Sequence, residues 1–167
     1  MDHLWAPWRR EFIDAPAADG CIFCRFPAET GPEADRRNLI LGRTARSFAI
    51  LNRFPYNNGH LMVVPLRHTA DFAGLPMEEL QDLQGLLQTA VRIVGELYKP
   101  AGANLGMNIG RDAGAGIEDH LHWHLVPRWR GDTNFMPVVG ATKVMIETLG
   151  QSWDALRPRF QAALAGR

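Results

Sequence analysis

The stretch His-Leu-His-Trp-His-Leu-Val-Pro at residues 120–127 decides which fold and function the chain is expected to have. Its histidines alternate with large apolar residues, and this alternation is typical of a half-buried β-strand. On such a strand His120, His122 and His124 point to one face, roughly 6.5 to 7 Å apart at each step. Three of the six histidines of the chain lie here. A row of imidazoles on one face is expected to bind a ligand.

Two kinds of chemistry are open to such a row. The imidazoles can be metal ligands, because histidine is the commonest metal-binding side chain. They can also act as a nucleophile and an acid, because an imidazole titrates near neutral pH. The stretch alone does not decide between metal binding and catalysis.

The composition is that of an ordinary soluble protein. The chain has 167 residues, which is enough for one domain with a core but too few for two domains of ordinary size. Its 18 basic and 18 acidic side chains balance, so no long-range field favours an extended polyanion. We therefore expect no nucleic acid as the main partner, although a local cluster can still bind a nucleotide.

The N-terminal twenty residues are interrupted by charged side chains and contain no continuous apolar segment. They therefore predict neither a signal peptide nor a membrane span, and a cytoplasmic location is expected. Cys21 and Cys24 are the only cysteines and have the spacing Cys-Ile-Phe-Cys. In a reducing compartment this spacing indicates half of a metal site or a redox pair, not a structural disulfide.

Periodicity predicts the elements around the histidine stretch. Strands are expected at residues 38–41, 47–51, 60–65, 103–109 and 120–126, with antiparallel pairing. A helix is expected from Pro76, at its first position, to Lys99, with an apolar stripe that packs on the sheet. Residues 21–24 are expected to form a tight turn and residues 25–37 a loop. Helices are expected at residues 145–149 and 153–164, with Pro158 as an interruption.

A glycine-rich segment at residues 110–116 directly precedes the histidine stretch. Three glycines in seven residues allow the backbone to approach a ligand closely and to present amide hydrogens to an anion. Most glycine-rich loops are only turns. The position next to three histidines favours a role in anion binding.

Residues 120–126 resemble the histidine triad (HIT) motif, His-φ-His-φ-His-φ-φ with φ apolar. Asn52-Arg53, Gly59-His60 and Asn108 follow the order of the same family, and the resemblance covers residues 38–130. It implies an α+β, HIT-like fold: an antiparallel sheet of about five strands, one long packed helix and a C-terminal helical segment. We therefore expect a single HIT-like domain over residues 1–167.

Within that domain, residues 1–37 are expected to form an N-terminal arm and a zinc-binding turn, residues 38–130 the HIT core and residues 131–167 a C-terminal extension. Residues 4–9 and 126–135 resemble a bacterial branch of the family that includes diadenosine tetraphosphate phosphorylases. The resemblance implies adenosine-containing nucleotides as substrates and a symmetric homodimer.

The resemblance also implies roles for the three histidines. His122 would be the nucleophile that attacks an α-phosphorus, because a neutral ring nitrogen with a pKa of about 6.5 need not first lose a proton. The attack would give a nucleotidyl-imidazole intermediate. His124 would orient or protonate the leaving oxygen, and His120 completes the catalytic triad.

Other residues are expected to bind the nucleotide. The amides of Gly116 and Ile117, with the Asn108 side chain, would hold the nonbridging phosphate oxygens. Many relatives have a hydroxyl residue where Ile117 stands, so that side-chain contact is absent here.

Three further positions match the family or flank its motif. Asn52 matches a position of the nucleotide pocket near the ribose. His60 would support the triad. Trp129 is expected to stack on a base or to shape the acceptor site, although simple packing would explain this residue equally well.

A zinc site is implied by a second resemblance. Galactose-1-phosphate uridylyltransferases, distant members of the superfamily, complete a zinc site with two histidines at positions that correspond to His68 and His120. Together with Cys21 and Cys24 these would form a Cys₂His₂ site, which has no open position and is therefore structural.

The leading functional hypothesis is a diadenosine tetraphosphate phosphorylase with a covalent nucleotidyl-histidine. A second hypothesis is a hydrolase of dinucleoside polyphosphates or nucleoside phosphoramidates, which uses water in place of phosphate. A third is a hydrolase with a catalytic metal on the three histidines. A fourth is a non-catalytic, zinc-stabilised nucleotide-binding module.

Overall fold

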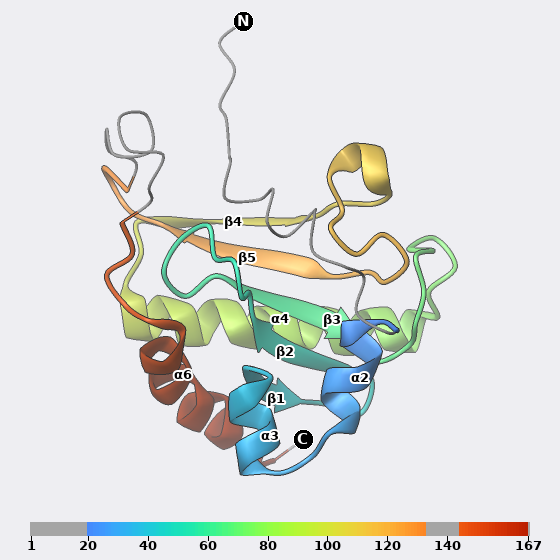
Figure 1. Cartoon of the computed structure of the whole chain (residues 1–167), viewed down its shortest axis with the longest axis horizontal. Helices are drawn as coiled ribbons and strands as arrows, with labels where there is room; N and C mark the ends of the chain where they lie inside the picture. The colour runs from blue at the N-terminus through green and yellow to red at the C-terminus, as the bar shows by residue number, and fades with distance from the viewer. Residues whose placement is uncertain (1–19, 133–143, 167) are drawn as a thin grey trace, which may run out of the picture.

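The computed structural model describes residues 20–132 and 144–166. Its core is an antiparallel sheet with the strand order β1-β2-β3-β5-β4 (Figure 1). The strands are β1 (Ile40–Arg43), β2 (Ser47–Leu51), β3 (Leu61–Pro65), β4 (Gly102–Met107) and β5 (Trp123–Arg128). The predicted five-stranded antiparallel sheet is thereby confirmed. The arm expected in residues 1–19 and the segment beyond residue 132 that resembles the bacterial branch lie outside the described residues.

Helices cover both faces of the sheet. The long helix α4 (Met77–Tyr98) and the C-terminal helix α6 (Leu149–Leu164) pack on one face, and α2 (Ile22–Ala28) packs on the other (Figure 1). Alternate residues of β2 enter the two cores: Phe48 faces α2, whereas Ala49 faces α4. Every residue of β2 is therefore buried, because both sides of the strand are covered and not only one.

Helix α4 forms as its apolar stripe predicts, and it ends at Tyr98 before Lys99, which adopts a left-handed conformation with φ 45°. Pro76 was expected at the first helical position but is the N-cap, one residue earlier. No helix in the described ranges is long and apolar enough to cross a membrane.

Residues 25–37 were wrongly predicted to be a loop. They contain most of α2 and the helix α3 (Pro32–Arg37). Pro32 begins α3, where its missing N–H costs no helical hydrogen bond, and Gly31 supplies the positive φ of 108° that precedes it. The turn expected at residues 21–24 is the first turn of α2, in which the carbonyl of Cys21 accepts from the amides of Cys24 and Arg25.

Helix α6 is continuous from Leu149 to Leu164, so the predicted interruption at Pro158 is wrong. The separate helix predicted at residues 145–149 is wrong as well, because residues 145–148 precede α6 and are not helical. A capping box between Thr148 and Gln151 begins the helix. Leu156 and Phe160 flank Pro158 and are fully buried. Their packing on the sheet holds the helix together through a residue that lacks an amide donor.

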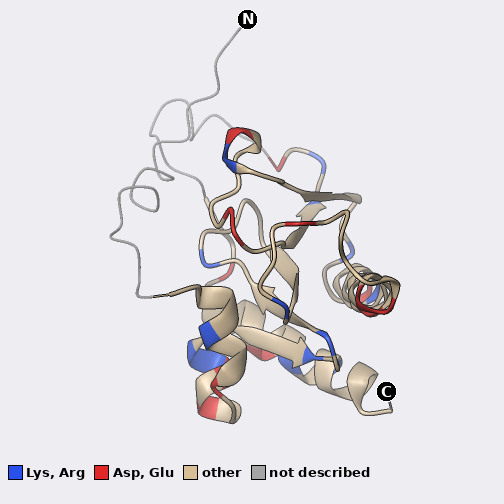
Figure 2. Ribbon diagram, turned by 90° about the vertical axis from the view of Figure 1, so that its right-hand side faces the viewer, with Lys and Arg blue, Asp and Glu red and all other residues tan. Residues whose placement is uncertain are grey.

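A buried ion-pair network joins α3, β1 and α6. Asp35 is 3% exposed and its two carboxylate oxygens lie 2.7 Å from the Arg43 guanidinium and 2.6 Å from that of Arg157. Arg157 also donates to the carbonyl of Leu41 at 2.7 Å. Elsewhere Lys and Arg are distributed along the ribbon with Asp and Glu between them (Figure 2).

Candidate functional site

The histidine stretch is only partly a strand. Strand β5 begins at Trp123, so His120 and His122 precede it and the strand predicted at residues 120–126 begins three residues later than expected. The Leu121 amide donates to the carbonyl of Thr69 at 2.8 Å. The His120 and His122 rings bond to main-chain carbonyls, and this local bonding replaces a continued strand ladder.

His122 lies on the sheet face that α2 covers and is 4% exposed. Its Nδ1 lies 2.8 Å from the carbonyl oxygen of His120. A carbonyl only accepts, so Nδ1 carries the ring proton and the lone pair is on Nε2. Burial lowers the pKa of His122 below its ordinary value, against the opposing effect of the carbonyl hydrogen bond. A ring of this kind is neutral at pH 7 and is a competent nucleophile.

His124 carries its proton on the other side of the ring. The Tyr56 amide donates to Nδ1 of the fully buried His60 at 2.9 Å. A neutral His60 therefore has its proton on Nε2 and donates it to Nδ1 of His124, at 2.9 Å. A neutral His124 must then be protonated at Nε2, which makes it a hydrogen donor.

The two rings lie in one site. The His122 and His124 centroids are 5.0 Å apart, with an interplanar angle of 73°. Phe23 of α2 packs against His122 at 5.2 Å and against His120 at 5.4 Å. The site therefore brings together a nitrogen lone pair and an N–H donor in a partly apolar environment. Phe23 and Tyr56 were not predicted, because aromatic residues in such segments are usually simple packing and main-chain donors leave no sequence pattern.

The glycine-rich loop contains the short helix η2 (Arg111–Ala113), and Gly114 has a φ of 87°. Asn108 donates to the carbonyl of Gly114 at 3.2 Å, which closes the loop. The Ile117 side chain packs against the apolar cluster around Phe23. Asn52 follows β2, and its side-chain oxygen Oδ1 accepts a hydrogen bond from the Phe54 amide at 2.9 Å.

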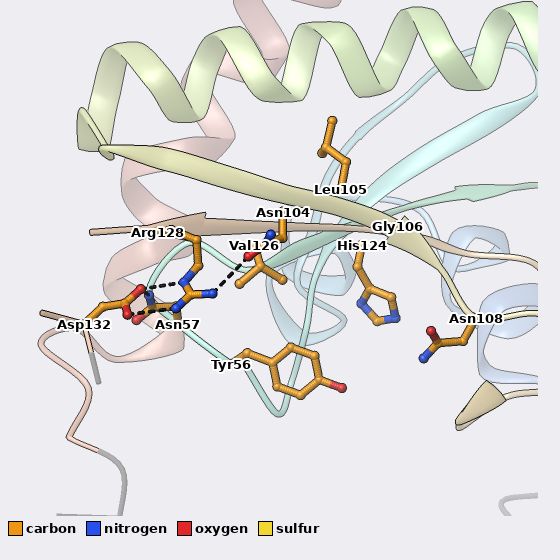
Figure 3. Close-up of a pocket in the computed structure, with 10 residues that line it drawn as sticks. All are labelled: Tyr56, Asn57, Asn104, Leu105, Gly106, Asn108, His124, Val126, Arg128 and Asp132. Carbon is orange, nitrogen blue, oxygen red and sulfur yellow. Dashed lines mark hydrogen bonds and ion pairs between the residues drawn. The ribbon is translucent and has the colours of Figure 1, made fainter. Parts of the chain in front are cut away.

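A pocket of about 380 Å³ extends from His124 along β5 (Figure 3). Its lining comes from β4, β5, the segments that follow each of them and the loop between β2 and β3: Tyr56, Asn57, Asn104, Leu105, Gly106, Asn108, His124, Val126, Arg128 and Asp132. Arg128 and Asp132 form a bidentate ion pair at its far end. Trp129, which was expected beside the acceptor, is not among these residues.

Four potential metal ligands meet around His120, at the opposite end of the triad from His124. Donor atoms of Cys21, Cys24, His68 and His120 all lie within 4.8 Å of one another. The Nδ1 atoms of His68 and His120 are 3.3 Å apart. His120 Nδ1 lies 3.3 Å from the sulfur of Cys21 and 3.7 Å from that of Cys24, and His68 Nδ1 lies 3.4 Å from the sulfur of Cys24. A tetrahedral zinc ion requires separations of about 3.3 Å between nitrogens and about 3.6 Å between sulfur and nitrogen.

The tautomer of His120 also fits a metal ligand. Its Nε2 lies 2.8 Å from the carbonyl of Pro65, so Nε2 carries the proton and Nδ1 presents a lone pair to the cysteines. The donor set and its spacing therefore suit zinc.

Comparison with known proteins gives consistent results. The model of the HIT domain matches residues 33–131. An AP-4-A phosphorylase of Mycobacterium tuberculosis is 36% identical over 154 residues, which cover 89% of this chain and 79% of the relative. A bis(5'-adenosyl)-triphosphatase of Saccharomyces cerevisiae is 35% identical over 92 residues, 54% of this chain and 44% of the relative.

Among solved structures, a zinc-bound histidine triad family protein from Mycobacterium smegmatis superposes with a TM-score of 0.66 at 23% identity, covering 88% of this chain and 97% of its own. A hypothetical histidine triad nucleotide-binding protein from Sulfolobus tokodaii superposes with a TM-score of 0.64 at 24% identity. The superposition covers 87% of this chain and 93% of that protein. At these identities the structures show the shared fold.

Proposed function

Because the chain belongs to the histidine triad (HIT) family, we propose that it cleaves dinucleoside polyphosphates at an α-phosphorus, most specifically as a diadenosine tetraphosphate phosphorylase. The observation that carries the proposal is the pairing of a lone pair on His122 with an N–H on His124. The 36% identity to an AP-4-A phosphorylase supports the choice of substrate.

In the first half-reaction, His122 Nε2 attacks the α-phosphorus of one adenylyl group and forms a P–N bond. The bond from that phosphorus to its bridging oxygen breaks, and ATP leaves with the oxygen. His124 donates its Nε2 hydrogen to this oxygen as negative charge develops there. The product that stays on the enzyme is an adenylyl group on His122.

In the second half-reaction, an oxygen of inorganic phosphate attacks the same phosphorus. The P–N bond breaks, its electron pair returns to His122 Nε2, and ADP is released. His124 now accepts the proton of the incoming phosphate. The sum is diadenosine tetraphosphate plus phosphate giving ADP plus ATP, with the enzyme regenerated.

The nucleotide contacts expected from the sequence belong to the same proposal. We propose that Asn108 and the amides of Gly116 and Ile117 hold the nonbridging oxygens, and that Asn52 lies near the ribose. The glycine loop, closed by the bond from Asn108 to Gly114, supports this role. Trp129 keeps a proposed role near the base, and His60 is a positioning residue for His124.

A hydrolase is the second candidate, because the relative from Saccharomyces cerevisiae is named bis(5'-adenosyl)-triphosphatase. Water then replaces phosphate in the second half-reaction, and AMP replaces ADP as the product. The first half-reaction is the same, so His122 and His124 keep their roles.

We further propose that Cys21, Cys24, His68 and His120 hold a structural zinc ion. The tetrahedral spacing of their donor atoms and the orientation of His120 by Pro65 support this. With four protein ligands the ion supplies rigidity and takes no part in bond breaking. It fixes the start of α2 against the triad. Thiol ligands of this kind also agree with a cytoplasmic location.

We also propose a homodimer. Strand β4 is an edge of the sheet and its first four residues are exposed, with Leu105 at 49%. An exposed edge strand is a template for pairing with another chain, and a second copy covers it by two-fold symmetry.

Product analysis tests the proposed function. Diadenosine tetraphosphate is incubated with the protein, with and without inorganic phosphate, beside His122→Ala and the exposed control Arg92→Ala. ADP plus ATP that form only with phosphate, and not with His122→Ala, support the phosphorylase. AMP plus ATP without phosphate indicate the hydrolase, and binding with no product indicates a non-catalytic module.

A further inference from the structure

Most of the pocket beside His124 lies between His124 and Arg128. His124, Val126 and Arg128 alternate along β5 and project to the same side of it (Figure 3). The pocket runs from Asn108 past His124 toward Arg128, and His122 does not line it (Figure 3). Over the four steps from His124 to Arg128 a strand advances about 13 Å. A group that departs past His124 therefore enters the far half of the pocket, toward Arg128, whereas the group bound to His122 stays near Asn108.

On the basis of the function proposed above, we propose that this pocket binds the second nucleoside of a dinucleoside polyphosphate. Its volume of about 380 Å³ falls in the range of small-ligand sites. Asn104, Val126 and Arg128 in the far half are then specificity residues for the leaving nucleotide, distinct from the residues that hold the adenylyl group.

The charges of the lining favour a nucleoside over a phosphate chain. Arg128 donates from Nε to Asp132 at 2.6 Å and from a terminal nitrogen to the other carboxylate oxygen at 3.0 Å. The charges of these two residues cancel, and no other lining residue in the described part of the chain is a Lys, Arg, Asp or Glu. A phosphate chain needs unpaired cations or an array of amides, so the far half suits a neutral group.

The remaining lining has the chemistry of a nucleobase site. Tyr56 supplies an aromatic ring and Val126 an apolar floor, so a flat ring has surfaces to pack against. The side-chain oxygen Oδ1 of Asn104 accepts a hydrogen bond from Arg128 at 3.0 Å. The Asn104 side chain therefore presents its nitrogen Nδ2 as a hydrogen-bond donor, and the ring nitrogens of a purine are acceptors.

A matched pair of substrates isolates the second nucleoside. Diadenosine tetraphosphate and adenosine 5'-tetraphosphate have the same phosphate chain and the same scissile bond, but the second lacks the distal nucleoside. We expect Asn104→Leu to raise KM for the dinucleotide about three- to tenfold, the loss of one or two hydrogen bonds. KM for adenosine tetraphosphate stays within about twofold. Asn104→Gln, which keeps the amide, recovers part of the loss.

A second variant protects the test against a folding defect. Val126→Phe fills the pocket floor and is also expected to raise KM selectively for the dinucleotide. Arg92→Ala, an exposed residue of α4 on the opposite face of the sheet, is the control and changes neither KM.

The outcomes separate this inference from the proposed function. An equal rise of KM for both substrates would mean that the pocket binds the phosphate chain, and unchanged values would mean that it is not used; either overturns the inference. Wild-type protein that cleaves neither substrate, or His122→Ala that cleaves both, overturns the proposed function instead.

Discussion

The three histidines of the triad differ in the neighbour that fixes each ring proton. Pro65 holds the proton of His120 on Nε2, whereas the carbonyl of His120 holds that of His122 on Nδ1. His60 donates to Nδ1 of His124. One residue type thus supplies the nitrogens for three proposed roles, as a metal ligand, a nucleophile and a hydrogen donor. The hydrogen-bond partner of each ring, and not its position in the motif, decides which ring nitrogen carries the proton.

Replacement of His60 tests the assignment of His124. His60→Phe removes the donor to Nδ1, so His124 can take the wrong tautomer, and we expect kcat to fall about 10- to 100-fold with little change in KM. His60→Gln retains an N–H donor and is expected to recover part of kcat. Steady-state kinetics with both variants provides the measurement. Equal losses in the two variants would indicate that His60 only fills space.

At the scale of elements, the short helix α2 connects the proposed metal site to His122, the proposed nucleophile. Its first turn follows Cys21 and contains Cys24, and between them Phe23 is 1% exposed and packs on both His120 and His122. A helix of seven residues has little stability of its own. The burial of Phe23 therefore helps to hold it in place, and the proposed zinc coordination by Cys21 and Cys24 would hold it further.

Removal of zinc is expected to destabilise the protein. We predict one zinc ion per chain by elemental analysis, and a fall in Tm on chelation or in Cys24→Ala, because the binding free energy of a structural zinc contributes to folding. Arg92→Ala serves as the reference and keeps both zinc and Tm. A zinc-free preparation with unchanged Tm and full activity would contradict the proposed site.

Two ion pairs between α3 and α6 allow a matched test of burial. Asp35 pairs with Arg157 in the interior, whereas Arg36 pairs with Asp154 at the surface, with side chains 53% and 52% exposed. We expect Asp35→Ala to lower the free energy of unfolding by about 3 kcal/mol, because it leaves two largely buried arginine side chains, 25% and 15% exposed, without their shared counter-ion. Arg36→Ala is expected to change it by less than about 1 kcal/mol. Urea unfolding of both variants measures the difference, and similar losses would refute the argument.

At the scale of the whole molecule, the site is assembled from segments far apart in the sequence. The loop after β2 supplies Tyr56 and His60, the start of α2 supplies Phe23, and β4 supplies Asn104. These elements meet on one face of the sheet, which has its own apolar core around Phe23, while α4 and α6 build the core on the other face.

The strands and α4 could be predicted because apolar periodicity is a direct consequence of burial. The extent of the histidine strand could not be, since the bonds from His120 and His122 to main-chain carbonyls are invisible in the pattern. Helices α2 and α3 were missed because Pro27, Gly31 and Pro32 usually interrupt structure, whereas Pro32 here begins a helix. Asn104 carries no motif, and only the pairing of β4 with β5 brings it beside Val126.

The proposed homodimer makes a prediction about mass in solution. Light scattering is expected to give the mass of two chains at micromolar concentration. The Leu105 side chain points away from the His124 side of the sheet (Figure 3), and Leu105→Lys is expected to shift the mass toward one chain. Arg36→Ala on α3 is the surface control. A single-chain mass for the unmodified protein would contradict the proposal.

The central claim is that His122 carries the adenylyl group during turnover, and trapping this intermediate tests it most directly. The protein is mixed with diadenosine tetraphosphate without phosphate, quenched in alkali within the first turnover, and analysed by peptide mass spectrometry. The account predicts one added adenylyl group on the peptide that contains His122, and its conversion to ADP when phosphate is added before the quench. Product formation with His122 unmodified, or an equal yield of adenylylated protein from His122→Ala, would contradict it.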